Sequence, residues 1–206
     1  MPEAPKRRRR FVLRWVLRAL LVPLALGLYL GGLQYSDNFH EVVPGELYRS
    51  AQPEGNAIAQ YSQQYGIRTI LNLRGENAKS PWYQNELAAS EKAGIKHLNF
   101  RMSSKRELTE AQAAQLIAIM RDAPKPLWIH CRGGADRSGL AAALYLAALK
   151  HEDAATASHQ LSLRYGHLSA FGLNNTVAMD RTFEALAPRL ISQKQAEALP
   201  NYSVSK

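Results

Sequence analysis

The sequence predicts an α/β fold: a central, mostly parallel β-sheet flanked by helices and preceded by one apolar N-terminal helix. Two observations lead to this fold class. After residue 46, short β-prone segments alternate with longer segments whose apolar residues recur at helical spacing. Such an alternation requires crossover connections, which make neighbouring strands parallel. Before residue 36, a run of arginines is followed by an uncharged stretch from residue 19 to residue 33.

Length and charge divide the chain into three parts. Its 206 residues have room for one domain and a short additional segment. We expect residues 1–35 to be a basic N-terminus with a membrane anchor or signal segment, residues 36–191 a folded domain, and residues 192–206 a polar tail. The net charge is +9, but residues 1–18 alone hold seven lysines and arginines against one glutamate. The basic character therefore belongs to the N-terminus and does not indicate a nucleic-acid partner.

The N-terminal segment allows two interpretations. Counted from Phe11, with Arg14 and Arg18 reaching back to the headgroups, the apolar stretch is long enough to span a bilayer. It is then an uncleaved anchor, and the basic flank stays in the cytoplasm while the folded domain lies beyond the membrane. Alternatively, the segment is a signal peptide that is removed. The absence of an Ala-x-Ala site after Leu33 favours the anchor. In a bacterium the folded domain would lie in the periplasm, tethered to the inner membrane or released from it.

The elements of the folded domain follow from local patterns. Residues 36–46 are rich in turn formers and predict a linker. Alternating or apolar β-prone segments predict strands over residues 47–50, 67–74, 95–100 and 127–130. Helical spacing bounded by glycine, proline or capping residues predicts helices over residues 54–65, 82–93, 109–122, 138–150, 153–165 and 173–187. The helix at 109–122 carries the clearest start signal, because Thr109 and Gln112 have capping-box spacing.

One motif concentrates the chemistry. The only cysteine, Cys131, lies in the sequence His-Cys-Arg-Gly-Gly-Ala-Asp-Arg-Ser-Gly at residues 130–139, between a predicted strand and a predicted helix. A strand, a tight loop and a helix N-terminus direct backbone N–H groups and the positive end of the helix dipole at one small space. A phosphate fits such a space, and a cysteine at its floor is favoured as the thiolate. A single cysteine also leaves no pair for an intramolecular disulfide or a cysteine-based zinc cluster.

This motif resembles the phosphate-binding loop of the cysteine-based protein tyrosine phosphatases, in particular the compact dual-specificity branch and its bacterial relatives. The segment Leu-Tyr-Arg-Ser-Ala-Gln-Pro at residues 47–53 is also similar to a segment of bacterial dual-specificity-like enzymes. The resemblance implies that residues 36–191 are a dual-specificity phosphatase-like catalytic domain, and that no metal or cofactor takes part. It implies a protein tyrosine or dual-specificity phosphatase that forms a phosphocysteine intermediate, with phosphotyrosine favoured. The alternatives are a phosphoinositide or inositol-phosphate phosphatase and a phosphotyrosine-binding pseudophosphatase.

The resemblance and the residue chemistry assign roles within the loop. Cys131 is the expected nucleophile, and Arg137 is expected to hold two phosphate oxygens through its planar fork. Ser138 is expected to stabilise the thiolate when the intermediate is hydrolysed and to cap the following helix. The expected substrate-binding part of the loop is Arg132, Gly133, Gly134 and Ala135, where the glycines let the backbone approach the phosphate. For Arg132, a solvated side chain that points away from the loop is the alternative.

The general acid is the open question in the sequence. Members of the family carry an aspartate on the loop after the preceding strand, but residues 101–107 contain none. The candidates are Asp136 inside the phosphate loop, Glu107 on the expected loop, and no dedicated acid. Without an acid, aryl phosphates would still react because a phenolate leaves more readily than an alkoxide. Outside the loop, Arg49 and Arg74 are candidates to line the mouth of the site, with a plain surface position as the alternative.

Overall fold

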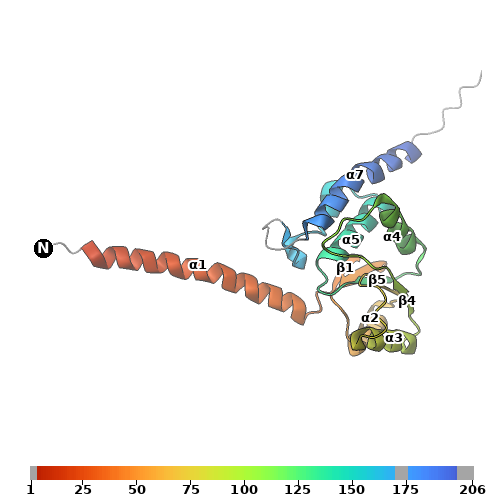
Figure 1. The fold of residues 1–206 in the computed structure, drawn as a ribbon, viewed down its shortest axis with the longest axis horizontal. Helices are drawn as coiled ribbons and strands as arrows, with labels where there is room; N and C mark the ends of the chain where they lie inside the picture. The colour runs from red at the N-terminus through yellow and green to blue at the C-terminus, as the bar shows by residue number, and fades with distance from the viewer. Residues whose placement is uncertain (1–3, 170–175, 199–206) are drawn as a thin grey trace, which may run out of the picture. The chain divides into compact units, whose positions relative to one another are not determined.

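The structure is a computed structural model that describes residues 4–169 and 176–198, and the chain divides after Ser36 into two units. The first unit consists of α1 (Ala4–Tyr35), seen in red and orange in Figure 1. Within α1, the 22 residues Arg14–Tyr35 are long and apolar enough to cross a membrane. The second unit holds the folded domain.

The folded domain is built on a five-stranded sheet with strand order β1-β2-β5-β3-β4. Only the edge strand β1 runs antiparallel to its neighbour, and the other pairs are parallel. The mostly parallel sheet predicted from the sequence is thereby confirmed. The strands are β1 (His40–Val43), β2 (Leu47–Ser50), β3 (Thr69–Asn72), β4 (Lys96–Asn99) and β5 (Leu127–His130).

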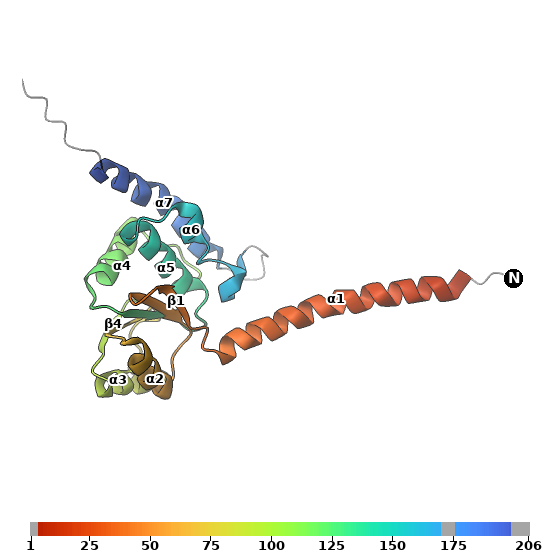
Figure 2. The same cartoon turned by 180° about the vertical axis from the view of Figure 1, so that it is seen from behind.

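Helices cover both faces of this sheet, as Figures 1 and 2 show. One face carries α4 (Glu110–Asp122), α5 (Asp136–Leu149) and α7 (Val177–Ala198), and the other carries α2 (Gly55–Tyr65) and α3 (Pro81–Lys92). The side chains of β5 alternate between the two layers. Leu127 and Ile129 belong to the apolar cluster under α5, whereas Trp128 belongs to the cluster under α2. The same alternation points His130 toward the α3 layer and leaves Cys131 with the α5 layer.

Local signals place several helix boundaries correctly. The capping box of Thr109 and Gln112 is present, and α4 begins at Glu110. Helix α2 ends at Tyr65, and Gly66, the predicted stop, follows it with φ +64°. Helix α5 begins at Asp136, two residues before the predicted start. Helix α7 begins at Val177 and continues to Ala198, past the predicted end at residue 187, while residues 173–175 of that prediction lie outside the described part of the chain.

Two predicted segments are wrong. Strand β1 lies in residues 36–46, where the turn formers predicted a linker, because pairing with β2 organises the four residues His40–Val43. The helix predicted over residues 153–165 is instead the short α6 (Ala154–Ser158), followed by a 3₁₀ turn, η1 (Leu163–Tyr165). A continuing helix would need the main-chain oxygen of Gln160 for itself, but that oxygen accepts a hydrogen bond from Arg49, 111 residues away. A tertiary contact therefore ends this helix early.

Candidate active site

The phosphate-loop motif connects β5 directly to α5 at the carboxyl ends of the parallel strands, where ligands bind in open α/β sheets. The structure brings all eight expected site residues, 131–138, together in this one turn. Cys131 lies at the floor and is only 3% exposed, next to the apolar cluster under α5. Its backbone N–H donates to the carbonyl of Ser50 over 3.4 Å, which fixes the loop to the end of β2.

Glycine is required at one position of the loop. Gly134 has φ +70°, and a Cβ there would lie 2.6 Å from the backbone nitrogen of Ala51 and 2.9 Å from Nδ2 of Asn38. The loop therefore packs against the segment after β2 with no space for a side chain. The carbonyl of Gly133 accepts a hydrogen bond from the same Nδ2 of Asn38 over 2.9 Å. The need for glycine at this position is thus explained by the close contact of the loop backbone with a neighbouring segment.

Arg49 braces the loop from inside the protein. Its side chain is fully buried, and Nη2 donates to the carbonyls of Gly134 and Ala135 at 2.8 and 2.9 Å. Its Nη1 donates at 2.8 Å to both the main-chain and the side-chain oxygen of Gln160. Its guanidinium carbon lies 4.1 Å from the ring centroid of Tyr165. The expectation that Arg49 lines the mouth is wrong, because β2 directs this side chain into the interior behind the loop.

Burial lowers the pKa of Arg49 to about 10, while Tyr165, Cys131 and Asp136 act in the opposite direction. The guanidinium remains charged at neutral pH, so a fixed positive charge lies behind Cys131. Because its acceptors are neutral oxygens, this charge is not cancelled by a direct ion pair. It favours an anion such as phosphate bound in the loop.

The remaining loop residues divide into buried and accessible groups. Arg137 is half-buried, and its Nε is buried with no hydrogen-bond partner among the described residues. Arg132 is exposed. Ser138 is fully buried, and its hydroxyl donates to the carbonyl of Ser50 over 3.4 Å. The expectation that Ser138 caps α5 is wrong, because the helix begins at Asp136 and places Ser138 within its first turn.

Asp136 is held by a histidine, His167. Its Oδ1 accepts a hydrogen bond from Nδ1 of His167 over 2.7 Å, and Nε2 of His167 donates to Asp180 on α7 over 3.0 Å. Burial alone would lower the pKa of His167, but the two carboxylates outweigh it and raise the pKa. The other candidate acid, Glu107, is an exposed residue 3.8 Å from Arg181. Asp136 is thus the better-ordered of the two carboxylates.

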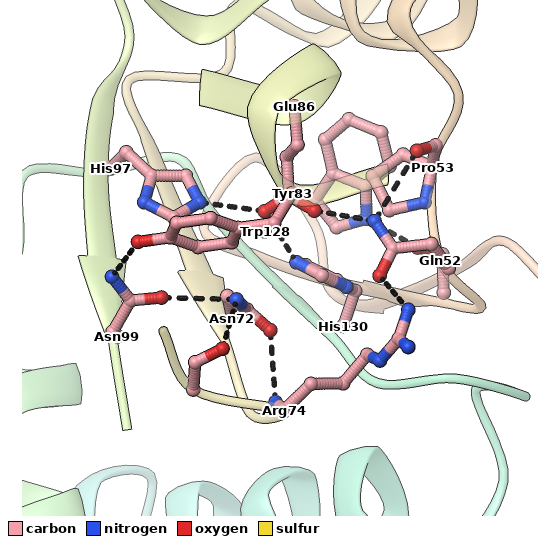
Figure 3. Close-up of polar contacts among 12 residues, drawn as sticks. Gln52, Pro53, Asn72, Arg74, Tyr83, Glu86, His97, Asn99, Trp128 and His130 are labelled. Atoms are coloured by element: carbon pink, nitrogen blue, oxygen red, sulfur yellow. Dashed lines mark hydrogen bonds and ion pairs between the residues drawn. The ribbon is translucent and has the colours of Figure 1, made fainter. Parts of the chain in front are cut away.

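A buried carboxylate, Glu86, joins the base of the loop to its surroundings (Figure 3). It is 1% exposed, and its Oε1 accepts from Nε2 of His130 at 2.9 Å and from Nε2 of His97 at 2.6 Å. The amide of Gln52 donates to its other oxygen. Burial alone would raise the pKa of Glu86. The charge of His130 and the three hydrogen bonds outweigh burial and lower the pKa to about 2, so the carboxylate is ionised.

Sequence reasoning missed the residues that support the loop, namely Asn38, Gln52, Glu86, Gln160 and His167. Each comes from a separate segment and contacts the loop, or Arg49 and His130 beside it, through tertiary structure, so no spacing marks them. The one available signal was the resemblance of residues 47–53 to bacterial relatives, which includes Gln52.

Comparison with known families decides the identity of the domain. The family model described as "PTP-SAK: Swiss Army Knife protein, DSP-PTPase phosphatase domain" matches residues 36–198. The chain belongs to this phosphatase family. The DSP-PTPase domain covers the folded unit, including the loop at Cys131. No curated protein sequence matches the chain.

Solved structures confirm the fold of the DSP-PTPase domain. P. aeruginosa TpbA in complex with pTyr has a TM-score of 0.60 at 19% identity, over 78% of this chain and 91% of its own. PTPMT1 in complex with PI(5)P has a TM-score of 0.60 at 15% identity, over 77% and 99%. The catalytic core of the PP-IP phosphatase SIW14 from S. cerevisiae has a TM-score of 0.55 at 20% identity, over 77% and 93%. At these identities the likeness establishes a shared fold, and the three names span different substrates.

Proposed function

We propose that the protein hydrolyses phosphomonoesters through a phosphocysteine intermediate on Cys131, and that phosphotyrosine is the favoured substrate. The observation that supports this most directly is the loop itself. The sulfur lies at its floor, a buried cationic Arg49 lies behind it, and the half-buried Arg137 has an Nε with no partner among the described residues. Such an arrangement stabilises the oxyanion of an in-line displacement at phosphorus.

The proposed roles follow the reaction. The thiolate of Cys131 attacks phosphorus, the S–P bond forms, and the bond from phosphorus to the leaving oxygen breaks. Arg137 holds the non-bridging oxygens through its fork, and the loop of Arg132, Gly133, Gly134 and Ala135 surrounds them. Water then hydrolyses the intermediate, and Ser138 stabilises the returning thiolate. We place Asp136 as the group that protonates the leaving oxygen, because it starts α5 within the loop whereas Glu107 faces Arg181 in solvent.

A substrate panel tests this function. The full chain in detergent should hydrolyse p-nitrophenyl phosphate and phosphotyrosine peptides, and phosphoserine peptides more slowly, because a phenolate is the better leaving group. Arg137→Lys keeps the charge but loses the bidentate fork, and should lower kcat/KM by about 10²-fold. No hydrolysis of any aryl phosphate by the wild-type chain would contradict the function. A phosphotyrosine-binding pseudophosphatase would bind these peptides without turnover.

A second candidate is a phosphoinositide or inositol-phosphate phosphatase. It is supported by the exposed Arg132, a second guanidinium on the phosphate loop. Neighbours in the fold are described with PI(5)P and as a PP-IP phosphatase. Soluble inositol phosphates and phosphoinositide vesicles belong in the same panel. A kcat/KM above that for every phosphotyrosine peptide would assign the function to this class.

We also propose that α1 anchors the chain, with the phosphatase domain on the extracytoplasmic side. The mainly apolar segment of 22 residues, Arg14–Tyr35, and the arginine run that precedes it support this orientation. In a bacterial host, protease added to spheroplasts should digest the phosphatase domain. Protection of the domain until the membrane is permeabilised would contradict the proposed orientation, and release by osmotic shock would indicate a cleaved signal peptide.

A further inference from the structure

Arg74 is an arginine at the site whose guanidinium is fixed by contacts on two sides, and Figure 3 shows its hydrogen bond to Gln52. Its Nη1 donates to Oε1 of Gln52 over 2.7 Å, and its guanidinium carbon lies 3.5 Å from the ring centroid of Trp82. A free arginine loses side-chain entropy when it binds a ligand, and most of that loss has already occurred here. The side chain is therefore preorganised for an anion.

The residue that holds Arg74 also touches the phosphate loop. The backbone N–H of Gln52 donates to the carbonyl of Arg132 over 3.2 Å, and its side-chain amide donates to Glu86, which in turn binds His130. Gln52 thus sets the position of Arg74 relative to the loop. The pKa of Arg74 is lowered, first by partial burial and then by the charges of Arg137 and Arg132, which places all three guanidinium groups in one electrostatic neighbourhood.

The guanidinium of Arg74 has donors to spare. Arginine carries five N–H donors. In Arg74, Nη1 is the only guanidinium nitrogen that has a hydrogen-bond partner among the described residues. Arg137 serves the reacting phosphate in the proposed function. Arg74 is then available for a different anionic group on the substrate, beside the phosphate.

A hollow of mixed polar and apolar lining begins at the same two residues that hold Arg74, although Arg74 itself does not line it. Its volume is about 610 Å³, and its lining includes Gln52, Trp82, Asn56, Asn85 and Glu54. Amide side chains can pair with the N–H and C=O groups of an extended chain, and an aromatic ring offers surface to its side chains. The exposed carboxylate of Glu54 in this lining disfavours a second phosphate there. These features fit a polypeptide better than a multiply phosphorylated small molecule.

We propose that this hollow and Arg74 form a subsite for the polypeptide segment that flanks the phosphotyrosine, in which Arg74 binds the carboxylate of a neighbouring acidic residue. Gln52 is the positioning residue that directs Arg74 toward that carboxylate. The proposal rests on the proposed phosphotyrosine phosphatase function and specifies its substrates. They are proteins with an aspartate or glutamate next to the phosphorylated tyrosine.

Two phosphotyrosine peptides that differ only in a flanking Glu or Gln test the subsite. With the full chain in detergent, we expect kcat/KM to be about tenfold higher for the Glu peptide, mainly through KM, because charge-assisted pairing with Arg74 exists only there. In Arg74→Ala the ratio of the two values should fall to about one. Gln52→Ala keeps the guanidinium but frees it, so the ratio should fall to an intermediate value. The ratio is compared within each variant, so an overall loss of activity does not affect it.

Arg121→Ala is the matched control, because Arg121 is an exposed arginine on α4 that pairs with its neighbour Asp122. Its ratio should equal that of the wild-type chain. Equal kcat/KM for both peptides in the wild-type chain, or an unchanged ratio in Arg74→Ala, would overturn the subsite. An Arg74-dependent preference for soluble inositol polyphosphates or phosphoinositide vesicles over both peptides would also overturn it. Failure to hydrolyse p-nitrophenyl phosphate would instead contradict the phosphatase function itself.

Discussion

Replacing Cys131 by serine is expected to lower kcat for p-nitrophenyl phosphate by about 10⁴-fold or more. The thiolate is the nucleophile in the proposed reaction, and a serine hydroxyl stays neutral at the same position. The variant changes little else, because the side chain is 3% exposed, close in size, and held through its backbone N–H to Ser50. Steady-state kinetics of both proteins, purified in the same detergent, measure the effect.

Binding provides the control for this variant. The serine variant should still bind a phosphotyrosine peptide, because Arg137, Arg49 and the loop amides do not depend on the sulfur. Acid quench of the wild-type chain during turnover should trap phosphate on the protein, and the variant should trap none. Since Cys131 is the only cysteine, a thiol reagent should inactivate the wild-type chain by modifying one residue. Turnover by Cys131→Ser within tenfold of the wild-type value would rule out a phosphocysteine mechanism.

The candidate phosphate loop could be predicted from sequence because its parts are contiguous. Cys131, Arg137 and the two glycines lie within seven residues, and the strand before them and the helix after them have local signals. The geometry of such a turn follows from strand, glycine and helix start. The parallel sheet followed from the same kind of reasoning, because alternation of strands and helices restricts the topology.

The residues that support the loop could not be predicted, because they come from segments distant in the sequence. Glu86 lies on α3 and contacts His130 from 44 residues away, and Asn38 reaches Gly133 from 95 residues away. Neither residue has a neighbour in sequence that marks it as part of a site. A glutamate within a helical pattern is ordinarily a solvent-exposed residue, and only the fold shows that Glu86 is buried between two histidines.

The two errors in the predicted secondary structure also come from contacts with distant segments. Strand β1 has the sequence His-Glu-Val-Val, only four residues among turn formers, and it forms because β2 offers an edge for pairing. The helix predicted over residues 153–165 ends early because Gln160 is needed at Arg49. In both cases a long-range partner decides between local alternatives. Arg49 shows in addition that the position of a residue in the sequence does not reveal its burial, because nothing in the sequence marks this strand-end arginine as buried.

Replacing Arg49 by methionine is expected to cost about 3–5 kcal/mol of folding free energy, because one buried cation satisfies several neutral acceptors. Methionine matches the length of the side chain but donates nothing. The carbonyls of Gly134 and Ala135 and both oxygens of Gln160 would then remain buried without this donor. For a domain of this size the loss corresponds to a fall in Tm of roughly 10 °C. Thermal unfolding of the full chain in detergent, with the DSP-PTPase domain as the reporting transition, measures it.

Two further variants separate the loss of the Arg49 hydrogen bonds from general effects of removing an arginine. Arg68→Met removes an exposed arginine just before β3, and should change the folding free energy by no more than about 0.5 kcal/mol. Arg49→Lys restores a charge without the planar fork, so it cannot reach the loop carbonyls and Gln160 together, and its Tm should fall between those of Arg49→Met and the wild type. Because the loop carbonyls lose their brace, kcat/KM for p-nitrophenyl phosphate should fall in the same order. A methionine variant with wild-type Tm and activity would show that Gly134 and the Asn38 contact hold the loop without Arg49.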